Sequence, residues 1–533
     1  MVSRSWVGAV ALVGMAFAVC AHANTFTVTT TADGGSGSLR QAIIDANAMT
    51  VTGGGACVPH SIVFAIPGDA PHTIQPLSEL PPLAISITMN AYTQPGAAEN
   101  TLDQGDNAVL GIELDGSLAG VGASGLVIAP STPGSGLCGG SGSTIRGFAI
   151  NRFDGGGITA IGETCPLGFS CGVGGVTISG NFIGTDVTGT VALPNAYGLE
   201  FGLHTSQNIV GDKLAVVGGP ISPAAASRNI IAGNLADGIY LSSADPMNAS
   251  EGHQIRNNYI GIGASGTTAL PNGRNGVFAD IGASGALIYE NLIGGHPGDG
   301  IKIEDNVLGF TNVVGNSIGM GLGGVPIPNA GDGVHISASV RAVSVGLRYP
   351  YFPLGSINIA YNGGAGVFVE GDSSGVDLIA AGIGRNGGLG FDLTPRGVNP
   401  QNPVQPDVGP NEALNAPVLT SLDFNPANSA LTIHGTLDTP PNSQIELHFY
   451  RSDTCNASGY GDGQQDFDFV NVTTDATGHA EFTRNTQVLA NSYITAFSRR
   501  FASAPADSTI IVSEFSNCLQ ASVDPIFSSG FDP

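Results

Sequence analysis

The sequence has few charged residues and almost no lysine. Charged side chains make up 11% of the 533 residues, whereas ordinary globular domains contain about 25%. Lys213 and Lys302 are the only lysines, and 42 acidic residues against 17 basic ones give a formal net charge of -25. Because nucleic-acid binding depends on lysine and arginine contacts to phosphates, we expect no nucleic-acid partner. The same excess of negative charge disfavours binding to anionic membranes.

Long apolar runs and long helices are also missing from the pattern. Beyond the first 23 residues, no stretch offers the ~18 uninterrupted apolar residues of a spanning helix, so we expect no integral membrane span. Glycine (80 residues) and proline (32 residues) together occupy about one position in five, and both interrupt helices. Aromatic residues are only 7%, although 42% of all residues are hydrophobic. This composition favours many short aliphatic strands joined by glycine-rich turns.

The N-terminus has the pattern of an export signal. Arg4 precedes an apolar run that ends at Cys20, and the next three residues, Ala-His-Ala, fit a small-x-small cleavage site. We therefore expect residues 1–23 to be a signal peptide and Asn24 to begin the mature chain. A lipoprotein cysteine at Cys20 is the alternative, but a bulky valine precedes it. The predicted location is extracellular or on the outer cell surface, with the periplasm as the alternative.

Six cysteines remain after the expected cleavage, and an even number in an oxidising compartment indicates disulfides. Six cysteines allow fifteen pairings, so the connectivity stays open. Separation along the chain favours three pairs, which are Cys165 with Cys171, Cys455 with Cys518, and Cys57 with Cys138. No Cys-x-x-Cys pair and no Cys/His cluster has the spacing of zinc ligands. We therefore predict neither a metal nor a cofactor as an essential component.

Calcium is the one ion that we keep as an alternative. The acidic run Asp462, Asp466 and Asp468 places three carboxylates in a short segment. Carboxylate oxygens are the ligands that Ca²⁺ prefers, but the EF-hand sequence is absent. A Ca²⁺ site in this segment is thus a hypothesis without a supporting motif.

Two short units recur along the chain. The first begins with asparagine and continues with any residue, isoleucine and glycine, at Asn181, Asn258, Asn291 and Asn316. The second is a turn residue, glycine, an aliphatic residue, any residue and usually another apolar one, beginning at Asp237, Asn275, Asp299, Asp332 and Ala365. We expect asparagine or aspartate before glycine to supply positive backbone dihedral angles at a turn. The alternation that follows predicts a short strand with one side chain inward and the next outward.

The spacing of these units indicates a stack of parallel coils. The interval from an asparagine to the next glycine of the second unit is four residues, as from Asn234 to Gly238, or seventeen, as from Asn181 to Gly198. Coils stacked at about 4.8 Å per strand can carry either a short turn or a longer excursion. A β-propeller is the alternative, but its blades need an even period of about 40 residues. We therefore predict an all-β fold, a parallel β-helix.

The first coil needs a cap, because an open end exposes unpaired backbone groups. Residues 38–47 have the pattern of a helix, with Ser38 and Gln41 placed as a capping box. Its apolar residues, Leu39, Ile43, Ile44 and Ala46, are expected to lie across the end of the stack. We therefore predict an N-terminal capping helix.

The composition changes near Asn411, after a stretch rich in proline. Six alternating segments then predict an antiparallel sandwich, at residues 430–437, 444–451, 467–474, 479–483, 493–498 and 509–515. The predicted organisation follows from these boundaries: a signal peptide (1–23), the N-terminal cap and first coils (24–110), the β-helix (111–394), a proline-rich linker (395–417), the sandwich (418–520) and a C-terminal tail (521–533).

Several segments resemble a family of secreted bacterial proteins, the CSLREA domain family. The similarity lies in residues 26–33 and 37–42, although Gly37 and Gln41 replace the Cys and Glu of the family name, and it extends to residues 62–68, 93–96, 181–186 and 475–482. Residues 526–532 are similar to a C-terminal signature of exported proteins from Gram-negative bacteria. The resemblance implies a right-handed β-helix followed by an Ig-like sandwich. It does not fix an activity, because members resemble both adhesins and the scaffold of polysaccharide lyases and hydrolases.

The second unit also predicts which outward side chains lie above one another. The aligned positions are Thr159, Glu200, Tyr240, Phe278, Lys302, His335, Phe368 and Asp392. Exposed aromatic rings one coil apart suit the flat faces of sugars, and neighbouring charges can bind hydroxyl groups. This makes five of them candidates for ligand binding: Glu200, Tyr240, Phe278, Phe368 and Asp392. The alternative is that the three aromatic residues form a covering layer beneath long loops.

Lys302 and His335 are the catalytic candidates of this column. They fall on adjacent coils, with Glu304 two residues beyond the lysine and Asp299 at the preceding turn. Acid–base chemistry on a polysaccharide needs a positioned base and a cation that offsets developing negative charge. The alternative is an exposed ion pair between Lys302 and Glu304, which contributes little. Neither the Asp-rich calcium site of pectate-lyase-like enzymes nor the Gly-His-Gly element of polygalacturonase-like enzymes is present.

From these patterns we predict a monomeric, exported or cell-surface β-helix protein. Its predicted role is that of a binding or adhesion module for a polysaccharide or cell-surface glycan. The alternative is a polysaccharide lyase or glycoside hydrolase with its site near Lys302 and His335.

Overall fold

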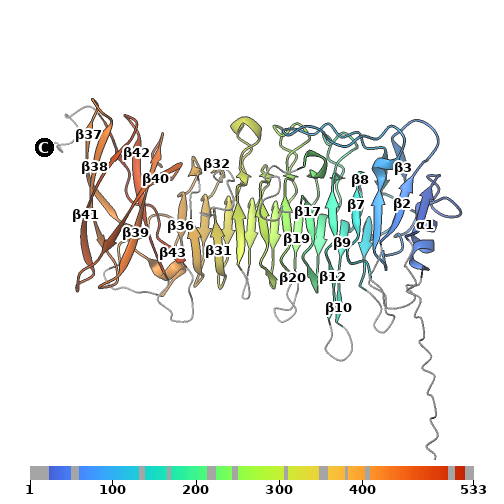
Figure 1. Ribbon diagram of the computed structural model, residues 1–533, viewed down its shortest axis with the longest axis horizontal. Coiled ribbons are helices and arrows are strands. Elements are labelled where there is room, and N and C mark those ends of the chain that lie inside the picture. Colours follow the sequence, from blue (N-terminus) through green and yellow to red (C-terminus); the bar gives the residue numbers. More distant parts are fainter. Residues whose placement is uncertain are drawn as a thin grey trace, which may run out of the picture.

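The computed structural model is an elongated stack of coils, with a helix at one end and a pair of antiparallel sheets at the other (Figure 1). The structure describes residues 23–49, 59–130, 139–164, 170–212, 224–242, 250–304, 310–346, 358–378, 382–402, 408–501 and 510–522. The expected signal peptide and C-terminal tail, as well as Lys213, therefore fall almost wholly outside the described residues. No helix within the described ranges has the length and hydropathy needed to span a bilayer.

Three long parallel sheets form the walls of the stack. Sheet A contains β1 (Thr25–Val28), β2 (His60–Phe64), β4 (Ile87–Asn90), β7 (Thr144–Arg146), β13 (Thr177–Ser179), β17 (Ile209–Gly211), β21 (Gln254–Arg256), β25 (Leu287–Tyr289), β28 (Thr311–Val314), β31 (Arg341–Val345) and β34 (Ser374–Leu378). Sheet B contains β3 (His72–Ile74), β5 (Ile112–Asp115), β8 (Phe148–Asn151), β14 (Phe182–Ile183), β18 (Ile230–Ile231), β22 (Tyr259–Ile260), β26 (Leu292–Ile293), β29 (Ser317–Ile318), β32 (Asn358–Ala360) and β35 (Gly382–Gly384). Sheet C contains β6 (Leu126–Ile128), β9 (Gly156–Ala160), β15 (Tyr197–Phe201), β19 (Ile239–Leu241), β23 (Val277–Ala279), β27 (Ile301–Ile303), β30 (Val334–Ile336), β33 (Val367–Val369) and β36 (Phe391–Leu393).

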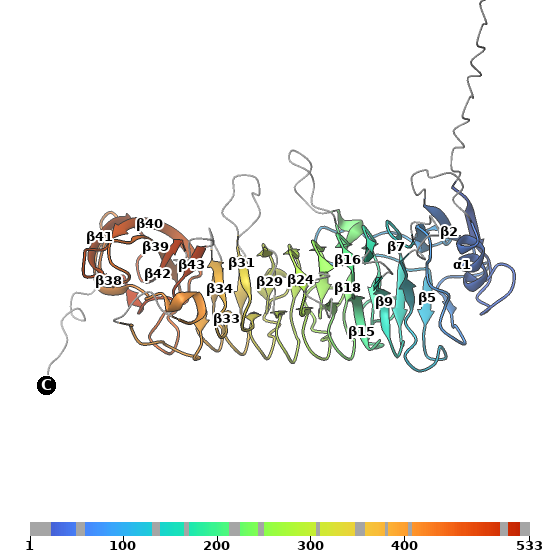
Figure 2. The same cartoon turned by 90° about the horizontal axis from the view of Figure 1, so that it is seen from below.

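From β4 onward each coil contributes one strand to each wall, and the view from below shows the coils side by side (Figure 2). The predicted right-handed parallel β-helix is thus confirmed. Smaller elements flank the walls: the parallel strands β12 (Val173–Gly174), β16 (Thr205–Ser206), β20 (Ser250–Glu251) and β24 (Ala283–Ser284), the antiparallel pair β10 (Glu163–Thr164) and β11 (Ser170–Cys171), and the 3-10 turns η1 (Ala91–Thr93), η3 (Ala225–Ser227), η4 (Leu322–Gly324) and η5 (Pro410–Ala413).

The interior combines aliphatic stacks with two ladders of buried asparagines. Between sheets A and B the ladder runs through Asn181, Asn229, Asn258, Asn291 and Asn316, and each amide donates to the side-chain oxygen of the next coil at 2.8–3.3 Å. A second ladder between sheets B and C includes Asn195, Asn234, Asn272, Asn329, Asn362 and Asn386. Buried amides need such partners, since an unsatisfied polar group costs about 1–3 kcal/mol. The asparagines of the first repeat unit are therefore internal hydrogen-bonding residues.

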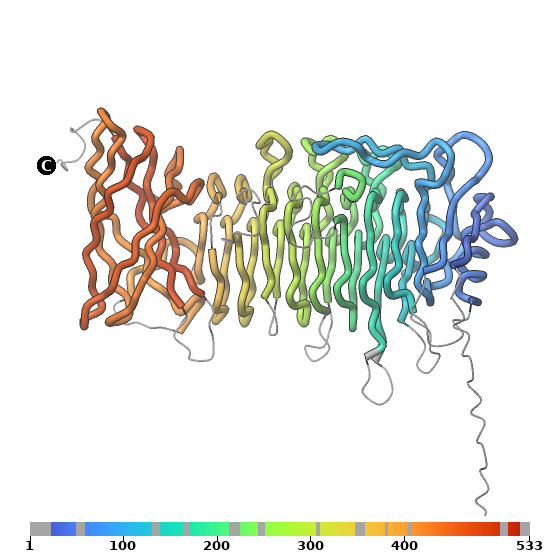
Figure 3. Tube along the Cα trace, viewed as in Figure 1, coloured from blue at the N-terminus to red at the C-terminus, as the bar shows by residue number. Residues whose placement is uncertain are grey.

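The longer of the two repeat intervals corresponds to small excursions beside sheet B. Isolated antiparallel bridges close three of them, at Thr185 with Ala192, Ile262 with Ala269, and Met320 with Pro326. A strap formed by residues 91–111 runs along the same side of the stack and reaches coils in the middle of the β-helix (Figure 3). The strap and the excursions cover a second hydrophobic cluster outside the main core, centred on Phe182 and Tyr259.

The predicted capping helix is confirmed as α1 (Leu39–Asn47). The Ser38 hydroxyl accepts a hydrogen bond from the Gln41 amide at 3.1 Å, as expected for the N-cap. The Gln41 side chain instead donates to Asp45, so only half of the capping box forms. Ile44 is 44% exposed, and the prediction that it lies across the first coil is wrong. It lies about 100° around the helix from Ile43, while the buried positions are Leu39, Ala42, Ile43 and Ala46.

The C-terminal region consists of two antiparallel sheets that fit a sandwich. One sheet contains β37 (Val418–Asn425), β38 (Ala430–Asp438) and β41 (His479–Gln487). The other contains β40 (Gln465–Thr473), β39 (Gln444–Ser452), β42 (Tyr493–Phe501), β43 (Ile510–Val512) and β44 (Leu519–Gln520). Sequence patterns missed β37, whose residues are mostly exposed or half-buried.

The sandwich closes the last coil of the β-helix. The bridge between Ile383 and Gly463 continues sheet B into the sandwich, and Phe515 belongs to the main core cluster. Arg499 on β42 forms an ion pair with Asp377 on β34 at 3.0 Å. The sandwich thereby covers the backbone groups that the last coil would expose. Helix α1 covers those of the first coil in the same way.

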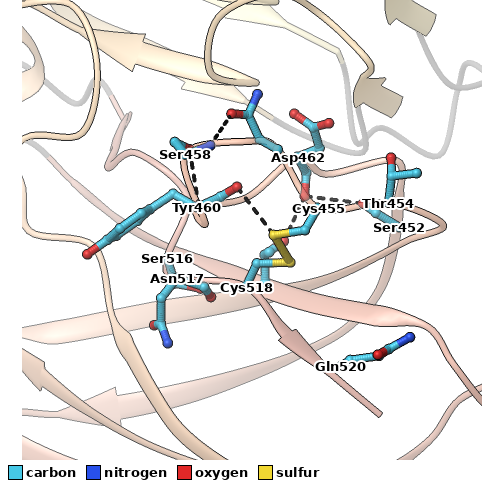
Figure 4. The surroundings of a disulfide bond; sticks show 12 residues. Ser452, Thr454, Cys455, Ser458, Tyr460, Asp462, Ser516, Asn517, Cys518 and Gln520 are labelled. Carbon is cyan, nitrogen blue, oxygen red and sulfur yellow. Dashed lines mark hydrogen bonds between the residues drawn. A yellow bond between two sulfur atoms is a disulfide. The ribbon is translucent and has the colours of Figure 1, made fainter. Parts of the chain in front are cut away.

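Cys455 and Cys518 form the disulfide that their separation favoured, between the β39–β40 loop and the segment before β44 (Figure 4). Cys171 is also disulfide-bonded, whereas Cys165, Cys57 and Cys138 lie outside the described residues. Two of the three predicted pairings therefore stay predictions.

Candidate outer face of sheet C

The outward side chains of sheet C form a single column. The strand register pairs Thr159 with Glu200, Glu200 with Tyr240, Tyr240 with Phe278, Phe278 with Lys302, Lys302 with His335, His335 with Phe368, and Phe368 with Asp392. This is the order that the repeat alignment predicted. We call this column, with the turn residues beside it, the outer face of sheet C.

A third ladder fixes the turn that precedes each strand of this face. The Asp237 Oδ1 atom accepts the backbone N–H of Asn275 at 3.0 Å, and the Asn275 side chain accepts that of Asp299 at 2.9 Å. Asp299 and Asp332 continue the ladder through their own Oδ1 atoms, each at 2.7 Å. One carboxylate oxygen thus holds the next coil, while the other lies near a cationic side chain of the face: Arg274 at Asp237, His335 at Asp299 and Arg396 at Asp332.

This ladder corrects our interpretation of the Asp/Asn-Gly pairs. We expected them to supply positive backbone dihedral angles, but neither the Asp/Asn residues nor their glycines have positive φ. The glycines are required because the coils approach closely. A Cβ atom on Gly333 would lie 2.3 Å from the Ile359 Cγ2 atom and 2.6 Å from the Gly366 carbonyl oxygen. The acidic or amide side chain before the glycine is required as the ladder acceptor.

The aromatic rings of the column are mostly covered. Phe278 is 6% exposed and Phe368 is 3% exposed, so the expectation of exposed rings at these two positions is wrong. Cations lie over both rings: the Lys302 Nζ atom of the next coil is 5.3 Å from the Phe278 centroid, and the guanidinium of Arg396, from the segment after β36, is 3.6 Å from that of Phe368. Long cationic side chains can cover apolar surface in this way while their charged ends stay in solvent.

Tyr240 remains partly accessible at the other end of the column. Its ring stacks on Tyr197 with the centroids 5.6 Å apart, and its hydroxyl donates to Asp280 at 2.6 Å. Burial is the main cause that raises the pKa of Tyr240 to about 12. Glu200 lies on the preceding coil, in register with Tyr240, and is half-buried. Burial raises the pKa of its carboxyl.

Lys302 is held in an ion pair with Glu304. Its side chain is 25% exposed, and that of Glu304 is 30% exposed. The arrangement fits the alternative of a surface ion pair, because Glu304 already neutralises the charge that a catalytic cation would offer to a substrate.

His335 is the centre of the most concentrated polar cluster on the face. Its Nδ1 atom lies 3.1 Å from the Asp299 carboxylate and 3.6 Å from that of Asp332, and its Nε2 atom lies 3.4 Å from that of Glu370. Burial lowers the pKa of His335, but the hydrogen bond to Asp299 and the three negative charges outweigh it and raise the pKa above the usual value. The imidazole is therefore biased toward its protonated form.

Asp332 and Arg396 belong to this cluster, although sequence patterns did not single them out as site residues. The Arg396 guanidinium donates to both oxygens of Asp332, at 2.9 and 2.7 Å. The second repeat unit carried a signal for Asp332, since it occupies the same position as Asp299. Arg396 had no signal, because it comes from the proline-rich segment after β36.

Asp392 is the last member of the column and is 3% exposed. Its carboxylate accepts the N–H of Gly397 at 3.0 Å. Burial raises its pKa to about 6. This position therefore supports the fold of the segment after β36 more directly than it offers a contact to a ligand.

Three side chains of the cluster could hold a metal ion. One ligand atom each from Asp299, Asp332 and His335 lies within 4.8 Å of the others. Two carboxylates and an imidazole suit a divalent cation, but Arg396 already neutralises Asp332. The acidic run in the sandwich does not converge in this way: Asp462 accepts from the Arg385 amide, Asp466 contacts His448, and Asp468 pairs with Arg484. The structure gives these three carboxylates separate partners, and a Ca²⁺ site in that run stays a hypothesis.

A shallow groove of about 740 Å³ lies along the neighbouring corner, between sheets B and C. Leu235 and three prolines, Pro271, Pro297 and Pro328, contribute to its surface. The lining amides of Asn272 and Asn329 are used in the internal ladder. The groove is therefore mainly apolar, and the carboxylate, imidazole and cationic side chains described above lie on the outer face of sheet C.

No family model matches the chain, and no curated protein matches it. Among solved structures, the chain is similar to the A-module of the Azotobacter vinelandii mannuronan C-5 epimerase AlgE4, with 11% identity over 69% of this chain and 91% of that one, and a TM-score of 0.40. It is also similar to the periplasmic alginate epimerase AlgG, with 14% identity over 63% and 68% of the two chains and a TM-score of 0.35.

A third similarity is to the enzymatically active domain of tailspike protein 2 from bacteriophage CBA120. The identity is 9%, the shares covered are 88% of this chain and 72% of that one, and the TM-score is 0.24. The parallel register of the three sheets supports one statement of identity. The chain is a parallel β-helix protein.

Proposed function

We propose that this protein is an exported β-helix protein that binds a polysaccharide or cell-surface glycan along the outer face of sheet C. The observation that carries the proposal is the unbroken outward column from Glu200 to Asp392. Acidic and basic side chains on successive coils flank this column. A repeating row of polar groups matches a ligand that is itself a repeating polymer with many hydroxyl groups. In this proposal Phe278 and Phe368 shape the floor, and Tyr240 with the charged side chains makes the contacts.

Export is part of the proposal. The N-terminal pattern of a signal peptide, the disulfide between Cys455 and Cys518 and the low lysine content support it. Disulfides persist in oxidising compartments outside the cytosol. The CSLREA-type relationship and an Ig-like character for the sandwich also stay within this proposal, as the interpretation that the sequence motifs support.

A second candidate is a polysaccharide lyase or glycoside hydrolase. The observation that favours it is His335, which three carboxylates hold toward the protonated form on a partly accessible face. A protonated imidazole can act as a general acid on a glycosidic oxygen, and one carboxylate can accept a proton. Lys302 supports this candidate less, because Glu304 neutralises it.

Affinity electrophoresis of the mature protein through gels that contain single polysaccharides tests the first candidate. We expect retardation by at least one polysaccharide and a loss of retardation in Tyr240→Ala, because this ring is accessible on the column. Phe501→Ala is the matched control, since Phe501 is 67% exposed on β42 in the sandwich, away from the face. Binding that is unchanged in Tyr240→Ala would place the ligand elsewhere and contradict the proposal.

The same polysaccharides, incubated with the protein, separate binding from catalysis. New reducing ends or unsaturated uronates that disappear in His335→Gln would establish the enzyme and displace the binding-only function. Retardation without any product, in the wild type as in His335→Gln, is the outcome that we expect.

A further inference from the structure

The outer face of sheet C has its cations already neutralised. Arg274 lies 3.5 Å from the Asp237 carboxylate, and Lys302 pairs with Glu304. An acidic ligand would therefore have to displace a carboxylate from each of these cations before it gained an ion pair of its own.

The same holds at the far end of the face. His335 lies 3.1 Å from Asp299, and Arg396 lies 2.7 Å from Asp332. Within the described part of the chain, no cation of the column or of the turn residues beside it is left for the carboxylate of a uronic acid. Removing one partner of such a pair also leaves the other charge uncompensated, which adds to the cost.

Two carboxylates on this face differ, because they have no cationic partner among the described residues. Glu200 has only a weak contact to the Thr159 hydroxyl at 3.5 Å. Asp280 accepts from the Tyr240 hydroxyl and from the backbone N–H of Ile281, both at 2.6 Å. Neither carboxylate is therefore paired with a cation of the described chain, and a cationic group of a ligand could take that place.

Aromatic rings accompany these two carboxylates. Glu200 is in register with Tyr240, whose ring packs between Tyr197 and Phe278, with both centroids 5.6 Å away. On its other side Tyr197 is in register with Gly156, which has no side chain, so the Tyr197 ring offers the face for a cation. Tyrosine faces attract cations, and ionised carboxylates form the stronger class of hydrogen bonds with them. A protonated amine is the small polar group that suits both kinds of partner, and it also suits a protein with a formal net charge of -25.

We propose that Glu200, Asp280, Tyr197 and Tyr240 form a subsite for a protonated amine, so that the ligand is a glycan of amino sugars rather than of uronic acids. This inference rests on the proposed function, because it assigns the ligand class of the same face. The paired cations on the other coils of the face then contact the hydroxyl groups of the glycan. The ligand class differs in charge from the alginate named in one of the similar structures.

Titration calorimetry of the mature protein with four oligosaccharides of equal length tests the inference. The probes are a glucosamine oligomer, its N-acetylated form, a neutral glucan and a galacturonate oligomer, all at pH 6 and 150 mM salt. We expect the glucosamine oligomer to bind at least about tenfold more tightly than its N-acetylated form, since acetylation removes the charge. We expect no binding of the galacturonate oligomer.

Glu200→Gln and Glu481→Gln form a matched pair of variants. Both remove one negative charge, but Glu481 is exposed on β41 in the sandwich. We expect Glu200→Gln to weaken glucosamine binding about fivefold or more and Glu481→Gln to leave it unchanged. Equal losses in the two variants would mean general attraction to an acidic surface and would overturn the subsite.

The failure of this inference is distinguishable from the failure of the proposed function. If the neutral or the acidic oligomer binds best and Tyr240→Ala abolishes that binding, the face binds glycans but the amine subsite is wrong. If none of the four probes and none of the polysaccharides binds, both are wrong.

Discussion

The β-helix and the C-terminal sandwich satisfy their buried polar groups in different ways. In the β-helix, strands of two to five residues are held by asparagine and aspartate side chains that bond the next coil. In the sandwich, the six strands β37 to β42 have eight or nine residues, β38 alternates strictly in burial, and a disulfide joins distant segments. The β-helix therefore depends on contacts between neighbouring coils, whereas the sandwich depends more on pairing within each sheet.

The largest expected effect comes from a glycine of the β-helix. Gly333→Ala places a Cβ atom 2.6 Å from a backbone oxygen of the next coil, and we expect it to lower the free energy of unfolding by about 3 kcal/mol or more. The coils cannot separate at one position without straining the ladders on both sides. Chemical denaturation followed by circular dichroism measures the loss.

Gly34→Ala is the control for this substitution. A Cβ atom at Gly34 meets no atom within 4 Å, so we expect a change within about 0.5 kcal/mol. Similar losses in both variants would show that close approach between coils does not explain the regular spacing of glycine within the repeat.

An intermediate effect is expected from the disulfide of the sandwich. Cys455 and Cys518 are 63 residues apart, and their joint replacement by serine should destabilise the sandwich by about 2–4 kcal/mol. Hydrogen exchange should become faster in β39 and β42, while the strands of sheets A, B and C in the middle of the β-helix keep their protection. Equal acceleration in both regions would show that the two regions unfold as one unit.

The smallest effect concerns the boundary between the two regions. Burial raises the pKa of Glu514 to about 7, although its carboxylate accepts hydrogen bonds from the Asn399 and Leu393 amides. A carboxyl whose pKa is higher in the folded state contributes stability below its unfolded value, near 4.5, and loses it as the pH rises through about 7. Glu514→Gln should therefore flatten the decline in melting temperature between pH 5 and pH 8.

Asp103→Asn provides the matched control for this pH dependence, because Asp103 is exposed in the strap of residues 91–111. Its replacement should leave the slope between pH 5 and pH 8 unchanged. A slope that is as steep in Glu514→Gln as in the wild type would assign the pH dependence to other groups.

The arrangement of coils could be predicted from the sequence, because residues that recur at regular intervals indicate a structure that repeats at the same intervals. Glycine and aliphatic residues repeat once per coil, so their alignment placed Tyr240, Lys302 and His335 in the order that the strand register has. The repeated asparagines were visible too, but the ladder required knowledge of which atoms face inward. In the second unit, the interpretation of the Asp/Asn residues before glycine as turn residues overlooked the hydrogen bonds that they form between coils.

Contacts made by non-periodic segments could not be predicted in the same way. Arg396 reaches Asp332 from a segment that has no counterpart in other coils. The burial of Phe278 and Phe368 also depends on which long cationic side chains lie over them, and the local alternation of apolar residues carries no information on that. The predicted column was therefore right in its order and wrong in part of its accessibility.

The strap of residues 91–111 has a consequence for the order of folding. Gly105 donates to the Tyr259 hydroxyl at 2.8 Å, and Asp106 donates to the Ala264 carbonyl at 2.8 Å. These partners lie more than 150 residues later in the chain, so an emerging polypeptide completes several coils before the strap can dock. A chain that folds as it is synthesised from its N-terminus would thus carry the strap undocked until the middle of the β-helix has formed, and docking would then join early and late coils into one cooperative unit.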